Sequence, residues 1–157
     1  MVSSSQVPFF PRWLTVVTPF ILLLGLPVLA GAVERTLTIK TPARIPAGQA
    51  FTVTVSAATD AGKGEQIGFL QVEASLDGGK TWEALFYLQK SGPKVTQQAR
   101  LMAGAGGSSV QVRARAAYRD GLAGDVDYRG GAIRWEESWK DWQEPPAKIA
   151  RISVNTP

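Results

Sequence analysis

The chain has 157 residues and a formal net charge of +4, and it contains neither cysteine nor histidine. It therefore lacks the commonest general base, a catalytic thiol and the commonest ligands of zinc and copper. No spacing marks a pair of acids of the kind that a glycosidase needs, and the basic residues form no long run. We expect a protein that is not an enzyme, holds no metal and no cofactor, and does not bind nucleic acid.

Residues 1–32 have the pattern of an export signal. A single base, Arg12, precedes an apolar stretch over residues 13–29, and small residues follow at 30–32. We predict cleavage before Val33, which places the rest of the chain in the periplasm or outside the cell. The alternative is an uncleaved anchor, although the apolar run is shorter than the roughly 20 residues that span a bilayer. Contact with a membrane is expected only in that case.

The first half of the mature part, residues 33–157, has the period of two that is typical of strands. Apolar and polar residues alternate from Arg35 to Val55, on either side of a connection that holds two prolines and a glycine. This predicts two paired strands, followed by a third at 70–76 and a fourth at 82–89. Because the fourth is apolar on both faces, we expect it within a sheet or under a covering loop.

The second half predicts three more strands, at 94–102, 109–118 and 148–154. About seven short strands, with turn signals about every ten residues and no core-helix pattern, predict a single all-β domain. The expected architecture is an immunoglobulin-like or fibronectin-like sandwich, and a small barrel is the alternative.

A long connection, residues 120–144, precedes the last strand, and connections of this length are usually functional or carry structure of their own. Three tryptophans recur in it at i, i+4 and i+7: Trp135, Trp139 and Trp142. This spacing predicts a Trp-rich loop or a short helix with its indoles along one side. Since indoles give large, rigid contact areas, these three residues, Tyr128 and Arg134 are the candidate binding residues. The alternative is that the indoles cap an open end of the sandwich.

Two groups of charged residues have structural expectations. Arg113 and Arg115 point from the same strand face, so we expect them to pair with Glu73 or Glu83 across a sheet. Three aspartates spaced by glycines offer oxygen ligands for calcium, but they lack a recognisable calcium-loop pattern and are expected to be turn residues. These are Asp120, Asp125 and Asp127.

The string from Ser75 to Trp82 has the pattern of an Asp-box hairpin. The Asp77 carboxylate and the two hydroxyls can bind turn amides, the glycines can adopt positive φ, and the indole is expected to fold back onto the core. Asp boxes occur in sialidase propellers, but several copies are found there in much longer chains. We therefore predict a structural hairpin, built from Ser75, Asp77, Gly78, Gly79, Thr81 and Trp82.

The wider stretch 68–82, GFLQVEASLDGGKTW, resembles part of the immunoglobulin-like dimerisation domain of sulfite oxidase-type molybdenum enzymes. The later strings VQVRARAAYRDG and IRWEESW resemble the last strands and the tryptophan-bearing loop of that domain. The sequence has no counterpart of the molybdenum-binding domain and no cysteine to ligate the metal. The resemblance implies the fold and a subunit-contact role, without redox chemistry.

These observations predict a non-catalytic exported module that works by contact, with another protein or with a second copy of itself. A second hypothesis is a carbohydrate-binding module whose exposed tryptophans stack on sugar rings of a glycan. A third is a tethered structural domain, which an uncleaved N-terminal segment would favour.

Overall fold

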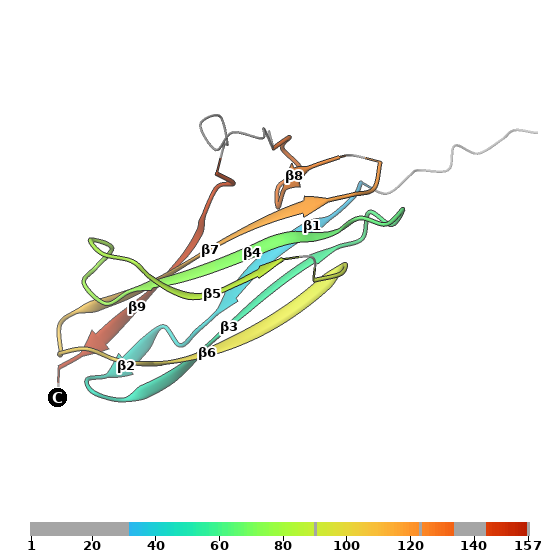
Figure 1. Cartoon of the computed structure of the whole chain (residues 1–157). Coiled ribbons are helices and arrows are strands. Elements are labelled where there is room, and N and C mark those ends of the chain that lie inside the picture. Colours follow the sequence, from blue (N-terminus) through green and yellow to red (C-terminus); the bar gives the residue numbers. More distant parts are fainter. Residues whose placement is uncertain (1–31, 90, 123, 134–143, 157) are drawn as a thin grey trace, which may run out of the picture. The chain divides into compact units, whose positions relative to one another are not determined.

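The computed structural model describes residues 32–156, apart from residues 90, 123 and 134–143 (Figure 1). Within this part the chain forms nine β-strands and no helix, so the predicted all-β class is confirmed. Ala32–Pro157 is one compact unit. No described segment forms a helix long and apolar enough to cross a membrane.

The smaller sheet has three antiparallel strands in the order β1-β3-β6. They are β1 (Arg35–Lys40), β3 (Ala50–Thr59) and β6 (Lys94–Met102). Phe51, Val53 and Val55 of β3 are buried, and the threonines between them lie on the other face. This alternation suits a strand with one face on a core and one toward solvent.

The larger sheet has six strands, five of them in the order β2-β9-β7-β4-β5, with β8 paired to β7. β2 runs parallel to β9, and the other pairs are antiparallel. The bounds are β2 (Arg44–Pro46), β4 (Gln66–Ser75), β5 (Glu83–Gln89), β7 (Ser109–Arg119), β8 (Val126–Asp127) and β9 (Lys148–Asn155). β2 and β8 were not predicted, because two or three residues are too few to show a period.

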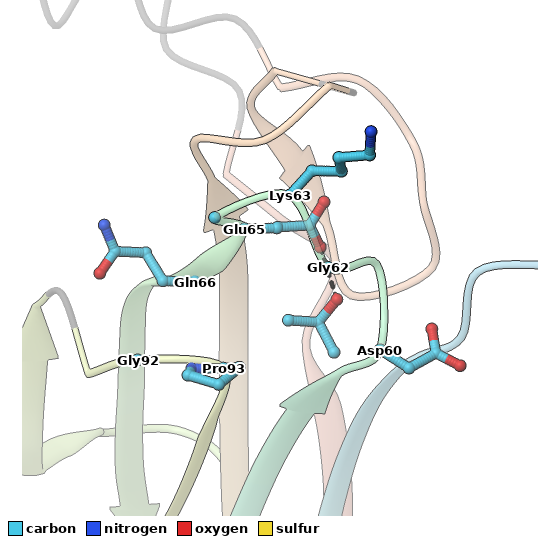
Figure 2. A pocket seen from close by; sticks show the side chains of 9 residues that line it. Asp60, Gly62, Lys63, Glu65, Gln66, Gly92 and Pro93 are labelled. Carbon is cyan, nitrogen blue, oxygen red and sulfur yellow. Dashed lines mark hydrogen bonds between the residues drawn. The ribbon is translucent and has the colours of Figure 1, made fainter.

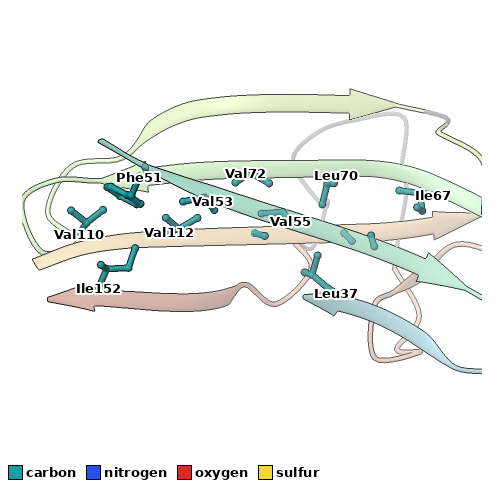
Figure 3. Close-up of a cluster of buried hydrophobic side chains, with 14 of the residues drawn as sticks. Leu37, Phe51, Val53, Val55, Ile67, Leu70, Val72, Val110, Val112 and Ile152 are labelled. Carbon is teal, nitrogen blue, oxygen red and sulfur yellow. The ribbon is translucent and has the colours of Figure 1, made fainter. Parts of the chain in front are cut away.

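The two sheets share one apolar core (Figure 3). Val110 and Val112 of β7 are fully buried because every second residue of the strand faces this core. Figure 3 shows them near Val53 of β3 and Val72 of β4, so the core joins side chains of both sheets. Full burial of each such aliphatic side chain contributes roughly 1.5–3 kcal/mol.

Strand β5 lies at the edge of the larger sheet, so the expectation that it lies within a sheet is wrong. The apolar pattern has another cause, because the pairing of β5 with β4 shifts register and skips Leu85. Leu85 and Phe86 can then both pack against the core, while Tyr87 faces outward and is 52% exposed.

A second register shift, at Gly68 of β4, sets Phe69 on the outer face of the larger sheet. Phe69 forms a small buried cluster there with Ala117 of β7 and with Ile133. A Cβ at Gly68 would lie 3.0–3.3 Å from side-chain carbons of Arg119, so the close approach favours glycine. The Trp-rich loop or short helix predicted within the connection 120–144 is not borne out: its described part, up to Ile133, forms turns and β8, and the three tryptophans lie outside the described residues.

Candidate functional site

The hairpin between β4 and β5 is organised by the Asp77 carboxylate. It accepts hydrogen bonds from the Ser75 hydroxyl at 2.7 Å, the Thr81 hydroxyl at 2.6 Å and the Lys80 and Thr81 amides at 2.9 Å. The Gly79 amide donates to the Ser75 hydroxyl at 2.7 Å, and Gly79 has a φ of 99°. The hydrogen bonds from the Thr81 hydroxyl and amide and from Ser75 hold the pKa of Asp77 far below its usual range.

Trp82 closes the hairpin against the outer face of the larger sheet. Its indole N–H donates to the Gly79 carbonyl at 3.1 Å, and the Arg113 guanidinium lies 4.1 Å from the ring centroid. The Gln111 amide nitrogen donates to the Gly78 carbonyl at 2.7 Å and ties the turn to β7. The expectation that the indole folds back onto the core is therefore corrected, because its partners lie on the opposite face of the sheet.

An ion-pair ladder crosses β7 and β4 beside Trp82. Arg113 pairs with Glu73, Arg115 reaches the same carboxylate at 3.2 Å, and Arg115 also contacts Glu144 at 3.1 Å. Both arginines were expected to pair with Glu73 or Glu83, and the structure shows Glu73 as the partner of both. The hydrogen bond from Arg113 outweighs partial burial and lowers the pKa of Glu73.

Two exposed apolar side chains flank this ladder. Tyr87 of β5 stacks on Phe69 with 5.9 Å between ring centroids, and the Gln89 amide donates to its hydroxyl at 3.1 Å. Ile149 of β9 is 43% exposed and lies opposite Arg113 in the β7–β9 register, hence on the same face. Tyr87, Trp82, Arg113 and Ile149 together are called the outer-face strip below.

A tight turn after β8 positions Tyr128 beside β1. The Asp127 carboxylate accepts hydrogen bonds from the amides of Arg129 at 2.7 Å and Gly131 at 2.9 Å. Tyr128 packs against the main core, and the Arg129 guanidinium lies 5.5 Å from its ring centroid. A hollow of about 400 Å³ lies between this turn and β1, lined by Arg35, Thr36, Leu37, Thr38, Tyr128, Arg129 and Lys148.

A second hollow, of about 510 Å³, lies around the loop before β4 (Figure 2). Glu65 is the buried charge in its lining, and its carboxylate accepts hydrogen bonds from Arg35 and from the Thr59 hydroxyl, the latter at 2.6 Å. Burial alone would raise the pKa of Glu65, but the Arg35 and Thr59 hydrogen bonds lower it. Lys63 projects away from this carboxylate in Figure 2. Because protein partners already satisfy Glu65, this hollow offers little for a ligand.

The three aspartates considered for calcium each have a protein partner. Asp120 accepts a hydrogen bond from Gln66 at 2.6 Å, Asp125 lies 3.7 Å from Arg119, and Asp127 binds the turn amides. Burial raises the pKa of Asp125. Across the described residues, no three acidic side chains converge in a way that could hold a metal ion.

Most of the binding residues predicted from the sequence lie outside the described residues, namely Arg134, Trp135, Trp139 and Trp142. Tyr128 is described, and it is half-buried rather than freely exposed. Tyr87, Ile149 and the Trp82–Arg113 stack were not predicted. The sequence held one sign that Tyr87 could be exposed, because Tyr87 is an aromatic residue in a strand with apolar residues on both faces.

Comparisons with known proteins give only distant similarities. No family model matches the chain, and no curated protein sequence matches it significantly. A superoxide reductase (neelaredoxin) from Ignicoccus hospitalis is similar in structure, with a TM-score of 0.47 and 16% identity over 81% of this chain and 86% of that one. Spo0M, a sporulation control protein from Bacillus subtilis, has a TM-score of 0.36 and 13% identity over 81% of this chain and 51% of its own. At these values neither similarity indicates a shared function.

Proposed function

We propose that residues 33–157 are an exported immunoglobulin-like module without catalytic activity, which binds another protein through the outer-face strip. The predicted signal sequence supports a location in the periplasm or outside the cell, where such a partner would be met.

The strand order supports the finer fold assignment. In constant-type immunoglobulin domains, strands A, B and E share one sheet and strands C, F and G share the other. Here β1, β3 and β6 form one sheet, and β4, β7 and β9 are consecutive in the other. The resemblance of residues 68–82 to a dimerisation domain points the same way and supports a subunit-contact role.

The observation that carries the functional proposal is the composition and exposure of the outer-face strip. Tyr, Trp and Arg are the residue types most enriched at the energetic centres of protein interfaces. Tyr87 is 52% exposed on a stacked Phe69, and Ile149 is 43% exposed on the other side of the ladder. Trp82 and Arg113 are held by the hairpin and by Glu73, so binding would cost little side-chain entropy.

Co-purification from the native host tests this function. We expect one protein to co-purify in a fixed ratio with the tagged full chain, and to be lost from the variants Tyr87→Asp and Ile149→Asp. Met102→Asp is the matched control, because Met102 is 57% exposed but lies on the smaller sheet. Retention of the partner by both outer-face variants, or equal loss from the control, would contradict the proposal.

Carbohydrate binding is the alternative function, and the Tyr87 ring favours it most among the described residues. One face of the ring is supported by Phe69, and the side chain is half exposed, an arrangement that suits stacking on a sugar ring. Binding of the purified protein to a glycan array, with loss in Tyr87→Ala and with no co-purifying protein, would favour this alternative.

A further inference from the structure

The hollow between β1 and the turn at Tyr128 has the features of a peptide-binding edge. Four consecutive residues of β1, from Arg35 to Thr38, line it. β1 is an edge strand of the smaller sheet. β3 pairs with one of its edges, and no described strand pairs with the other. A free strand edge beside a hollow is the arrangement that allows an extended peptide to add as a further strand.

The described lining of this hollow carries a positive charge. Arg35 is neutralised by Glu65, but neither Arg129 nor Lys148 forms an ion pair with any described residue. Among the described residues that line the hollow, none is acidic. Arg129 and Lys148 are therefore two cations beside a strand edge that no described acid neutralises. Such a pair complements a peptide segment that carries carboxylates.

The lining is also held in place before any ligand arrives. The hydroxyl of Tyr118, a residue of the main core, donates to the Thr36 carbonyl at 2.7 Å and so holds β1 in place from the side of the core. The Asp127 carboxylate fixes the turn that carries Tyr128 and Arg129. This turn lies close to β1, since a Cβ on Gly130 would be 3.5 Å from the Arg35 guanidinium. Preorganisation of this kind lowers the entropic cost of binding.

We propose that this hollow binds an extended acidic peptide segment of a partner protein, which pairs with the free edge of β1 while its carboxylates contact Arg129 and Lys148. A peptide fits better than an acidic glycan, because four of the seven described lining residues belong to the edge strand β1 and the one aromatic ring among them, Tyr128, already lies beside Arg129. This site shares no residue with the outer-face strip, since Lys148 and its neighbour Ile149 point to opposite faces of β9, so it can exist whether or not the strip binds a partner.

Fluorescence anisotropy with the purified protein and a labelled peptide, Thr-Glu-Val-Glu-Val-Glu-Thr, tests the proposal. We expect saturable binding that weakens about tenfold or more in the double variant Arg129→Glu, Lys148→Glu, because two charge-assisted contacts are lost. The control Lys94→Glu, Arg100→Glu changes the net charge equally on β6 and should bind as the original does. All four side chains are exposed, so both double variants should fold, which their melting curves would verify.

Two further peptides separate strand addition from simple charge attraction. A peptide with N-methylated alternate amides should bind much more weakly, because it cannot complete the hydrogen bonds to β1. A peptide with Gln in place of Glu should also lose affinity, because it has no carboxylates. Absence of binding by the acidic peptide, equal binding of the N-methylated or Gln peptide, or equal weakening in the β6 control would overturn the proposal. Tighter binding of a sulfated oligosaccharide of equal charge would overturn the choice of a peptide.

Discussion

Arg35 and Glu65 form a bidentate ion pair with both donor–acceptor distances at 2.7 Å, and their side chains are only 8% and 1% exposed. Arg35 begins β1 of the smaller sheet, and Glu65 directly precedes β4 of the larger one. Thr59, at the end of β3, donates to the same carboxylate. The pair therefore joins the two sheets at one end of the core, and this chain has no disulfide that could do so.

Removing one partner of this pair should be costly. Arg35→Met leaves the Glu65 carboxylate buried without its main donor, and we expect a loss of about 3–5 kcal/mol in the free energy of unfolding. The double variant Arg35→Met, Glu65→Leu should recover a large part of this loss, since no buried charge then remains. Urea unfolding of the three proteins measures both values, and a double variant less stable than Arg35→Met would contradict this interpretation.

Stability should fall in mild acid. The pKa values of Glu65 and Glu73 are lowered in the folded protein, so the unfolded chain binds more protons as the pH falls. Their contribution is complete above the ordinary carboxyl pKa of about 4.3 and is lost as the pH drops through the lower folded values. Melting temperatures between pH 7 and pH 3 would show this decline, and Glu73→Gln should flatten it; an unchanged melting temperature down to pH 3 would exclude it.

Substitution of two glycines in the loop after β7 allows the energetic cost of backbone strain to be compared with the cost of a steric contact. Gly124 has a φ of 68° and no atom within 4 Å of the place a Cβ would take, so Gly124→Ala should cost about 1–2 kcal/mol through strain alone. Gly121 has a φ of 88°, and its Cβ would lie 2.9 Å from the Cβ of Glu65, so Gly121→Ala should cost clearly more. Equal unfolding free energies for the two variants would show that the contact with Glu65 is easily relieved.

The Asp77 hairpin should contribute to stability and not directly to binding. Asp77→Ala removes the acceptor for the hydroxyls of Ser75 and Thr81 and for two amides, so we expect a lower melting temperature. Lys80→Ala is the control, because only the backbone of Lys80 contacts Asp77. Loss of the co-purifying partner in Asp77→Ala with an unchanged melting curve would indicate a binding residue instead.

Alternation in the sequence was sufficient to locate the long strands, because each has one face on the core. Val110 to Ala116 alternate with polar residues, and this pattern also placed Arg113 and Arg115 on the face where they meet Glu73. Spacing alone therefore predicted that these arginines pair across the sheet, but it left Glu73 and Glu83 as alternative partners.

The candidate surface could not be predicted in the same way. Register shifts at Gly68 and Leu85 change which face a side chain takes without any change in composition, so Phe69 and Tyr87 could not be assigned to the outer face. Trp82 was expected on the core from the Asp-box pattern, whereas the hairpin places its ring against the Arg113 guanidinium on the outer face. Such positions depend on pairing between strands that are far apart in the chain.

Photo-cross-linking in the native host tests the central proposal most directly. A photoreactive phenylalanine analogue would replace Tyr87 in one protein and Met102 in another, two positions of similar exposure at 52% and 57% on different sheets. Contact through the outer-face strip predicts an adduct with one protein from position 87 and none from position 102. The same adduct from both positions, or an adduct from position 102 alone, would contradict it.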